Sequence, residues 1–247
     1  MIDWKAPVPF FVLLSTIVAY LLCIYVIFPA TKPQSKKLIQ TLGFYHHTAL
    51  CIYSLFICSS VLYYMWSIGD FTNYQQFLCS PVDGWVRFLS ISFAISKIWE
   101  WFDTAIFIWR GKTLHEIGFL HIYHHTTTTL LFLVVMNAPG TERLGMLMNG
   151  FVHTLMYFHY AFRLPKPLRP LITIFQIIQL VLATYYWYVI GEVCPACIQH
   201  KMDHPIEYLI PYACVPVYCI FFIRFFFSEY IFKKSPSDKA YAAKKML

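Results

Sequence analysis

The chain has 247 residues, of which 59% are hydrophobic and only 13% are charged, and this composition is typical of an integral membrane protein and not of a soluble one. The formal net charge is +7, but the basic residues fall between apolar stretches, so the charge gives no reason to expect a nucleic-acid partner. No separate soluble domain is expected within residues 1–247.

Seven apolar stretches follow one another along the chain. Each is close to or above the roughly 20 residues that a helix needs to cross a hydrocarbon core of about 30 Å. They lie at about 8–28, 42–66, 85–109, 118–136, 144–162, 171–190 and 205–231. We therefore predict an all-α polytopic membrane protein, a single membrane domain with seven transmembrane helices. The first stretch lacks a basic leader and a small-residue cleavage site, so a retained helix is expected there.

Basic residues concentrate in the connections that follow the first, third, fifth and seventh stretches. Lys and Arg in short loops stay on the cytosolic side of a membrane. We therefore predict a lumenal N-terminus and a cytosolic tail at 232–247. The basic residues are Lys32, Lys36, Lys37, Arg110, Lys112, Arg163, Lys166, Arg169, Lys233, Lys234 and Lys239.

The third stretch carries ionisable side chains, which cost about 2.5–3.5 kcal/mol each at mid-membrane and so usually mark function. Three- and four-residue spacing places the set on one helical face. Its members are Lys97, Glu100, Asp103 and Thr104. A structural ladder of ion pairs is the alternative, although a pair of Lys97 with Glu100 would leave Asp103 available for another partner.

The fourth stretch begins with three histidines, His121, His124 and His125, which the same spacing gathers on one face. The fifth and sixth stretches add further polar side chains, which are Asn149, His153, Met156, Tyr157 and Tyr160, then Thr173, Gln176 and Gln179. On the predicted topology all four sets lie in the cytosolic half of the membrane. They predict one polar chamber open to the cytosol, with interhelical hydrogen bonding as the alternative for the last two sets.

Two kinds of chemistry suit a histidine-lined chamber, metal catalysis and covalent catalysis. A di-iron desaturase or hydroxylase needs several histidine clusters, yet His200 and His204 fall on the predicted lumenal side and His46-His47 lack a third member, so no metal is predicted. Because no cysteine lies between Cys79 and Cys194, a neutral imidazole is the expected nucleophile. A seven-helix transporter also remains open, although apolar residues 130–135 and 181–183 fit an acyl tail better than a pore.

Three cysteines fall in connections predicted to be lumenal, where disulfides form and persist. We expect Cys79 to pair with Cys194 or Cys197, and three unpaired thiols are the alternative.

Four segments resemble, in order and spacing, the motifs of the very-long-chain fatty acid elongase family. They begin at Lys97 (KIWEWFDT), His121 (HIYHH), Asn149 (NGFVHTLMY) and Thr173 (TIFQIIQ), and the likeness covers about residues 81–234. The chain departs from the family pattern at His159, where a tyrosine is usual.

The resemblance implies a 3-oxoacyl-CoA synthase, an acyltransferase that condenses acyl-CoA with malonyl-CoA and releases carbon dioxide and CoA. It implies six helices, about 42–231, ringed around an acyl-chain tunnel, with the helix at about 8–28 outside. His124 would form an acyl-imidazole, with His153 near the same carbon and His121, His125 or Asn149 stabilising oxyanions. The expected substrate-binding residues are Lys97, Glu100, Asp103, Thr104, Tyr157, Gln176 and Gln179.

No tightly bound cofactor is expected, because the CoA thioesters are substrates. The segment Phe119–His125 resembles the version of the motif common in elongases of polyunsaturated chains. Lys244 and Lys245 resemble a dilysine retrieval signal, which predicts residence in the endoplasmic reticulum. The expected partners are the lipid bilayer and the reductases and dehydratase of the elongation cycle, and the sequence leaves open whether the chain forms a homodimer.

Overall fold

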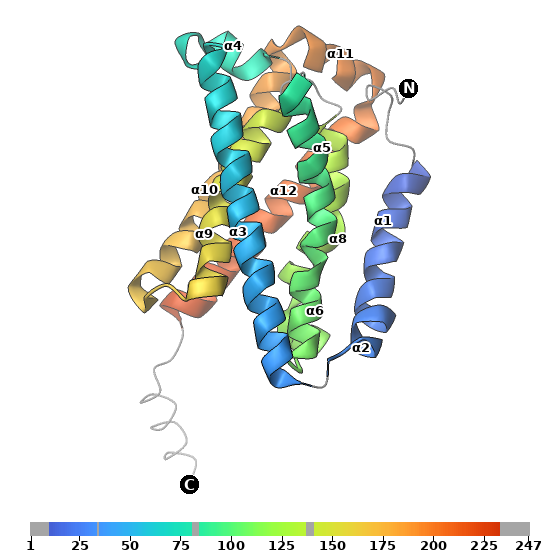
Figure 1. Cartoon of the computed structure of the whole chain (residues 1–247). Helices are drawn as coiled ribbons and strands as arrows, with labels where there is room; N and C mark the ends of the chain where they lie inside the picture. Colours follow the sequence, from blue (N-terminus) through green and yellow to red (C-terminus); the bar gives the residue numbers. More distant parts are fainter. Residues whose placement is uncertain (1–9, 34, 81–83, 137–140, 233–247) are drawn as a thin grey trace.

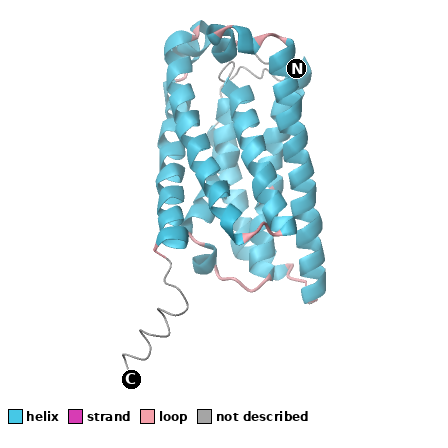
Figure 2. Ribbon diagram, turned by 90° about the vertical axis from the view of Figure 1, so that its left-hand side faces the viewer, coloured by secondary structure: helices cyan, strands magenta, loops and turns pink. Residues whose placement is uncertain are grey.

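A computed structural model describes residues 10–33, 35–80, 84–136 and 141–232, and within these ranges the chain is helical with no strand (Figure 1, Figure 2). This confirms the all-α prediction for the described residues. The beginning of the first predicted stretch at residue 8, the basic residues Lys233, Lys234 and Lys239, and the proposed signal Lys244-Lys245 lie outside the described residues.

Each predicted apolar stretch is helical in its described part. The segments of the first half are α1 (Phe10–Leu22), η1 (Cys23–Ile27), α2 (Phe28–Ala30), α3 (Lys36–Ser67), η2 (Asp70–Thr72), α4 (Tyr74–Cys79), α5 (Gly84–Trp99), α6 (Trp101–Trp109) and α7 (Leu114–Ile117). Those of the second half are α8 (Phe119–Val135), α9 (Thr141–Phe162), η3 (Lys166–Leu168), α10 (Arg169–Val193), α11 (Pro195–Asp203), α12 (Pro205–Phe226) and η4 (Phe227–Ile231).

One predicted boundary was wrong, and one predicted stretch is divided in two. The second stretch begins at Lys36 and not near residue 42, because the side chain of Ser35 caps α3 by accepting a hydrogen bond from the backbone N–H of Leu38. The third stretch is divided at Glu100 into α5 and α6, where the backbone N–H of Asp103 bonds to the carbonyl of Glu100 three residues earlier and tightens the turn.

Three helical segments of the described chain are both long enough and apolar enough to cross a membrane. They are Lys36–Ser67, Lys166–Val193 and Pro205–Ile231, and a shorter apolar helix covers Leu14–Ala30. These segments give the chain the character of a membrane protein.

Six long segments pack in a closed order, each against the next. Helix α3 lies along α9, which packs against α10, then α12, α8 and α5, and α5 and α6 return to α3. Helix α1 contacts α8 and α2 contacts α6 from outside this circle, and Figure 1 shows α1 at the periphery. The short helices α4 and α11 lie together at one end of the bundle.

The end that carries α4 and α11 is tied together covalently and by a buried ion pair. A disulfide joins Cys79 to Cys194, with Cα atoms 5.3 Å apart. Arg143, fully buried, pairs with Asp70 and donates hydrogen bonds to the backbone carbonyls of Gln76 and Phe77 within α4. Cys197 is not part of this disulfide. Burial raises the pKa of its thiol to about 12, so the thiol stays protonated and is a poor nucleophile for thiol–disulfide exchange.

Candidate active site

A cavity lies between α8, α9, α10 and α12. One part of its lining is polar and consists of His124, Thr128, Asn149 and Gln179. The rest is apolar or aromatic, made by Leu131, Phe132, Val135, Leu144, Gly145, Met148, Leu180, Ala183, Tyr186, Trp187, Ile190, Pro211, Val215 and Tyr218. Along α8 and α10 the apolar residues follow the polar ones in sequence, and along α9 they precede Asn149. The apolar part therefore extends toward the end of the bundle that carries the disulfide.

His124 of α8 faces this cavity at its polar part. Its Nδ1 atom is buried and has no hydrogen-bond partner among the described residues. The ring stands edge-on to Tyr218 of α12, with centroids 5.0 Å apart, and the hydroxyl of Tyr218 is bonded to Thr127. Sequence spacing gave no signal for Tyr218, because it reaches the site from another helix. Of the three histidines, His124 is the one that lines the cavity.

A buried ion pair between Lys97 of α5 and Glu100, the residue between α5 and α6, orients the polar side chains of α9. The Nζ atom of Lys97 donates to Oε1 of Glu100 at 2.7 Å and to Oδ1 of Asn149 at 2.8 Å. His153 Nδ1 lies 3.3 Å from the same Glu100 oxygen. Because an ammonium group can only donate, the amide oxygen of Asn149 must face Lys97, and its NH₂ group remains available as a donor at the cavity.

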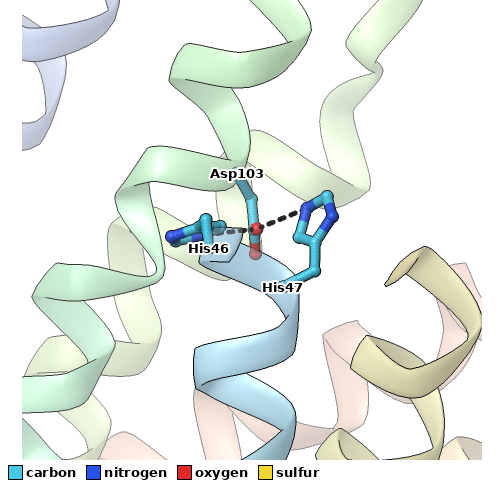
Figure 3. A group of neighbouring side chains, drawn as sticks. All are labelled: His46, His47 and Asp103. Carbon is cyan, nitrogen blue, oxygen red and sulfur yellow. Dashed lines mark hydrogen bonds and ion pairs between the residues drawn. The ribbon is translucent and has the colours of Figure 1, made fainter. Parts of the chain in front are cut away.

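Asp103 joins α6 to two histidines that the sequence prediction had set aside (Figure 3). Its Oδ1 atom lies 2.9 Å from Nε2 of His46 and 3.4 Å from Nε2 of His47, and Oδ2 accepts a 2.8 Å hydrogen bond from Tyr157. Among the described residues, the third potential ligand beside His46 and His47 is the carboxylate of Asp103 and not the third histidine that a histidine box would need. The three ligand atoms lie within 4.8 Å of one another, and two imidazoles with one carboxylate would suit a divalent transition metal. Hydrogen bonds alone, however, already satisfy both oxygens of Asp103.

The remaining histidines of the fourth predicted stretch, His121 and His125, are not among the residues that line the cavity. Nε2 of His121 lies 2.9 Å from the hydroxyl of Thr104, which lies 2.9 Å from the hydroxyl of Tyr20 on α1. His125 packs against His121 with ring centroids 4.3 Å apart, and its Nδ1 atom has no hydrogen-bond partner in the described chain. His124 and His125 are adjacent in sequence, and a helix turns by about 100° per residue, so these two histidines point in different directions. The three histidines therefore do not share the one face that the sequence prediction expected.

The other predicted side chains divide between the cavity and the packing around it. Gln179 lines the cavity, Gln176 contacts the sulfur of Met156 at 3.6 Å, and Thr173 is buried. Tyr160 packs edge-on to His47 outside the cavity. His159, which had been left out of the site, accepts a hydrogen bond from the backbone N–H of Leu164.

The structure also places the two groups that the sequence prediction used to exclude other chemistry, the histidines His200 and His204 and the cysteine thiols. The rings of His200 and His204 pack at a tilt with centroids 5.0 Å apart, at the end of the bundle that carries α11 and away from His124. A thiol lies closer than the sequence prediction assumed, because Cys214 of α12 packs with Leu131 and Tyr218. Cys214 is not among the residues that line the cavity, whereas His124 is.

An all-helical membrane protein with a cavity that is polar at one part and apolar at the other is suited to an amphipathic, long-chain ligand. The family described as ELO: GNS1/SUR4 family matches this chain over residues 8–238, and the chain belongs to that family.

Relatives that match this chain are named fatty acid elongases. Fatty acid elongase 6 of Leishmania major is 31% identical over 156 residues, which cover 62% of this chain and 41% of the relative. Fatty acid elongase A of Dictyostelium discoideum is 35% identical over 158 residues, covering 60% and 56%. Fatty acid elongase 1 of Trypanosoma brucei brucei is 41% identical over 101 residues, covering 38% and 32%. The match spans less than two thirds of the length of each of these relatives.

Proposed function

We propose that this protein is the condensing enzyme of fatty acid elongation, a 3-oxoacyl-CoA synthase of the acyltransferase class. Acyl-CoA and malonyl-CoA would give a 3-oxoacyl-CoA two carbons longer, with release of carbon dioxide and CoA. The observation that carries this proposal is the position of His124, with an unpartnered Nδ1 atom, where the polar part of the cavity meets the apolar part. Membership of the family and the names of the relatives support it.

In the first step the imidazole of His124 attacks the thioester carbonyl. A C–N bond forms, the C–S bond breaks, and the CoA thiolate leaves with the proton that the imidazole loses. The NH₂ group of Asn149, oriented by Lys97, is the donor best placed to stabilise the oxyanion. The acyl tail would lie along the apolar lining toward Trp187 and Ile190.

In the second step malonyl-CoA loses carbon dioxide and leaves an enolate. Its carbon attacks the acyl-imidazole carbonyl, so that a C–C bond forms and the C–N bond to His124 breaks, and His124 takes up a proton from solvent. Glu100 holds His153 beside this region, and Gln179 adds a further polar group to the lining. No metal and no tightly bound cofactor is needed for either step.

The arrangement in the membrane is part of the proposal. Seven helices would cross the bilayer, and α3, α5 with α6, α8, α9, α10 and α12 would form a ring around an acyl-chain tunnel. The closed packing order and the apolar cavity support this. The disulfide suits an oxidising lumen at the end of α4 and α11, and Arg110 and Arg163 at the ends of α6 and α9 suit the cytosol.

We also propose residence in the endoplasmic reticulum, because Lys244 and Lys245 resemble a dilysine retrieval signal. Such a signal must face the cytosol, and the proposed orientation of the chain meets this requirement. Replacing both lysines by serine should let a tagged protein move to later compartments while its activity in isolated membranes is unchanged. Retention of the variant would reject this address.

The decisive experiment uses purified full-length protein with radiolabelled malonyl-CoA and a panel of saturated and polyunsaturated acyl-CoAs. We expect label in a product two carbons longer, with preference for polyunsaturated chains, and loss of turnover in His124→Ala. Acyl-CoA alone should release CoA and leave an acyl adduct visible by intact-mass analysis. Desaturated or hydroxylated product, or ligand transport without condensation, would reject the proposal.

A further inference from the structure

Helix α1 lies outside the circle of packed helices, yet it delivers one hydroxyl to the histidine cluster. We propose that Tyr20 on α1 is a positioning residue, which acts through Thr104 to fix the orientation and the tautomer of His121. The inference rests on the proposed function, and it makes the outer helix part of the active site.

The inward face of this segment is narrow and apolar except at Tyr20. Tyr20, Ile24 and Phe28 are buried at four-residue spacing and pack with Trp101 and Ala105 of α6. Residues on the opposite side, such as Tyr25, are exposed, as expected of a surface that faces lipid. Among the described residues of α1, Tyr20 is the one buried side chain with a polar group.

A chain of two hydrogen bonds leads from Tyr20 to His121. The hydroxyl of Tyr20 lies 2.9 Å from Oγ1 of Thr104, and the same Oγ1 lies 2.9 Å from Nε2 of His121. Tyr20 and Thr104 are both completely buried. Because water does not reach these two hydroxyl groups, each hydroxyl proton must be donated to a protein acceptor in this series of hydrogen bonds.

The direction of the chain follows from counting protons. If Tyr20 donates to Thr104 and Thr104 donates to Nε2 of His121, every hydroxyl proton has an acceptor. In the reverse direction the Tyr20 proton would have no acceptor among the described residues. Nε2 of His121 is therefore the acceptor, and the ring hydrogen is on Nδ1.

The fixed orientation of His121 also affects His125 and His124, because the rings are in contact. Tyr20 stacks on His125 with centroids 6.3 Å apart and an interplanar angle of 24°, and His125 in turn packs against both His121 and His124. With Nε2 occupied, Nδ1–H is the one donor that His121 can offer to a reacting group. Without the two hydrogen bonds that link Tyr20, Thr104 and His121, the imidazole ring of His121 could rotate or change tautomer.

The test uses purified full-length variants Tyr20→Phe, Thr104→Val and Thr104→Ser, with Tyr25→Phe as a matched control. Thr104→Val leaves the buried Nε2 of His121 without its donor, so we expect it to lower kcat about tenfold with an unchanged KM for acyl-CoA. Tyr20→Phe should lower kcat several-fold, and Thr104→Ser should restore most of the loss. The variant Tyr20→Phe/Thr104→Val should be no worse than Thr104→Val, because both act through one chain.

A spectroscopic measurement separates this inference from the proposed function. Nitrogen NMR of protein labelled at histidine should show His121 protonated at Nδ1, with a changed signal in Thr104→Val and in Tyr20→Phe but not in Tyr25→Phe. If the wild-type protein does not condense substrates, the proposed function fails, and this signal still tests the inference. An Nε2-protonated His121, or unchanged kcat in both Tyr20→Phe and Thr104→Val, overturns the inference.

Discussion

Lys97 on α5 and Asn149 on α9 are joined by a buried 2.8 Å hydrogen bond from the ammonium group to the amide oxygen. Since the same ammonium group is paired with Glu100, the amide of Asn149 is held in one orientation by an ion pair 52 residues away in sequence. Its NH₂ group is not used by the ion pair, and Asn149 lines the cavity, where a preorganised donor can stabilise developing negative charge.

Replacing Asn149 by alanine should therefore lower kcat by about 100- to 1,000-fold with a much smaller change in KM, because the lost donor acts mainly on the transition state. The measurement is steady-state condensation with purified protein. Gln40→Ala, which removes an exposed amide on α3, is the control and should behave as wild type. A change confined to KM would show that Asn149 only binds substrate.

Replacing Lys97 by methionine should destabilise the protein by about 3–5 kcal/mol, because it leaves the buried carboxylate of Glu100 without its cation. The double variant Lys97→Met/Glu100→Gln removes the stranded charge and should recover much of the lost stability. Thermal unfolding in detergent measures both variants. Equal stability of the single and double variants would contradict this account of the pair.

Filling the apolar part of the cavity should shorten the acyl chains that the protein accepts. Ala183 lines the cavity one helical turn beyond Gln179, so Ala183→Phe should abolish condensation of long acyl-CoAs and spare short ones. Val181→Phe introduces the same side chain on the exposed side of α10 and should leave the chain-length profile unchanged. Product analysis by mass spectrometry decides, and identical profiles for both variants would place the acyl tail elsewhere.

Removing the Cys79–Cys194 disulfide should cost about 2–5 kcal/mol, because the bond closes a long loop and restricts the unfolded chain. The variant Cys79→Ala/Cys194→Ala should unfold at a lower temperature, and a reductant should lower the unfolding temperature of the wild type to the same value without affecting the variant. Cys219→Ala is the matched control. Peptide mapping without reduction should recover the Cys79–Cys194 pair and no Cys79–Cys197 pair.

The His46, His47 and Asp103 group should act through hydrogen bonds and not through a metal ion. Both carboxylate oxygens of Asp103 already accept hydrogen bonds, so chelator treatment should leave condensation unchanged and elemental analysis should find no stoichiometric transition metal. One equivalent of metal that disappears in His46→Ala and His47→Ala would reverse this prediction.

The parts of the site that could be predicted from sequence are those set by spacing within one helix. Lys97 and Glu100 are three residues apart, and the structure pairs them as spacing alone suggests. Helical periodicity and hydropathy also give the all-helical fold, because both are local properties of the chain. The assignment of His124 to a catalytic role drew on a resemblance, and its place in the cavity lining agrees with that role.

The contacts that spacing could not reveal are those made between helices. The partners of Asp103 come from α3 and α9, and Tyr218 comes from α12. Tyr20 comes from a helix that the sequence prediction placed outside the ring. Which helices become neighbours is decided by side-chain packing over the whole bundle, and a single sequence read one helix at a time carries no record of it.

The disulfide also has a consequence for biosynthesis. Its two cysteines are 115 residues apart, and the interval from Cys79 to Cys194 contains all four polar motifs, from Lys97 to Gln179. The bond cannot form until α10 has been made and inserted, so oxidation reports that the segment bearing the motifs is complete. If this end of the bundle lies in an oxidising lumen, as proposed, a chain arrested earlier would still present a reduced Cys79, and the redox state of Cys79 would distinguish unfinished molecules from finished ones.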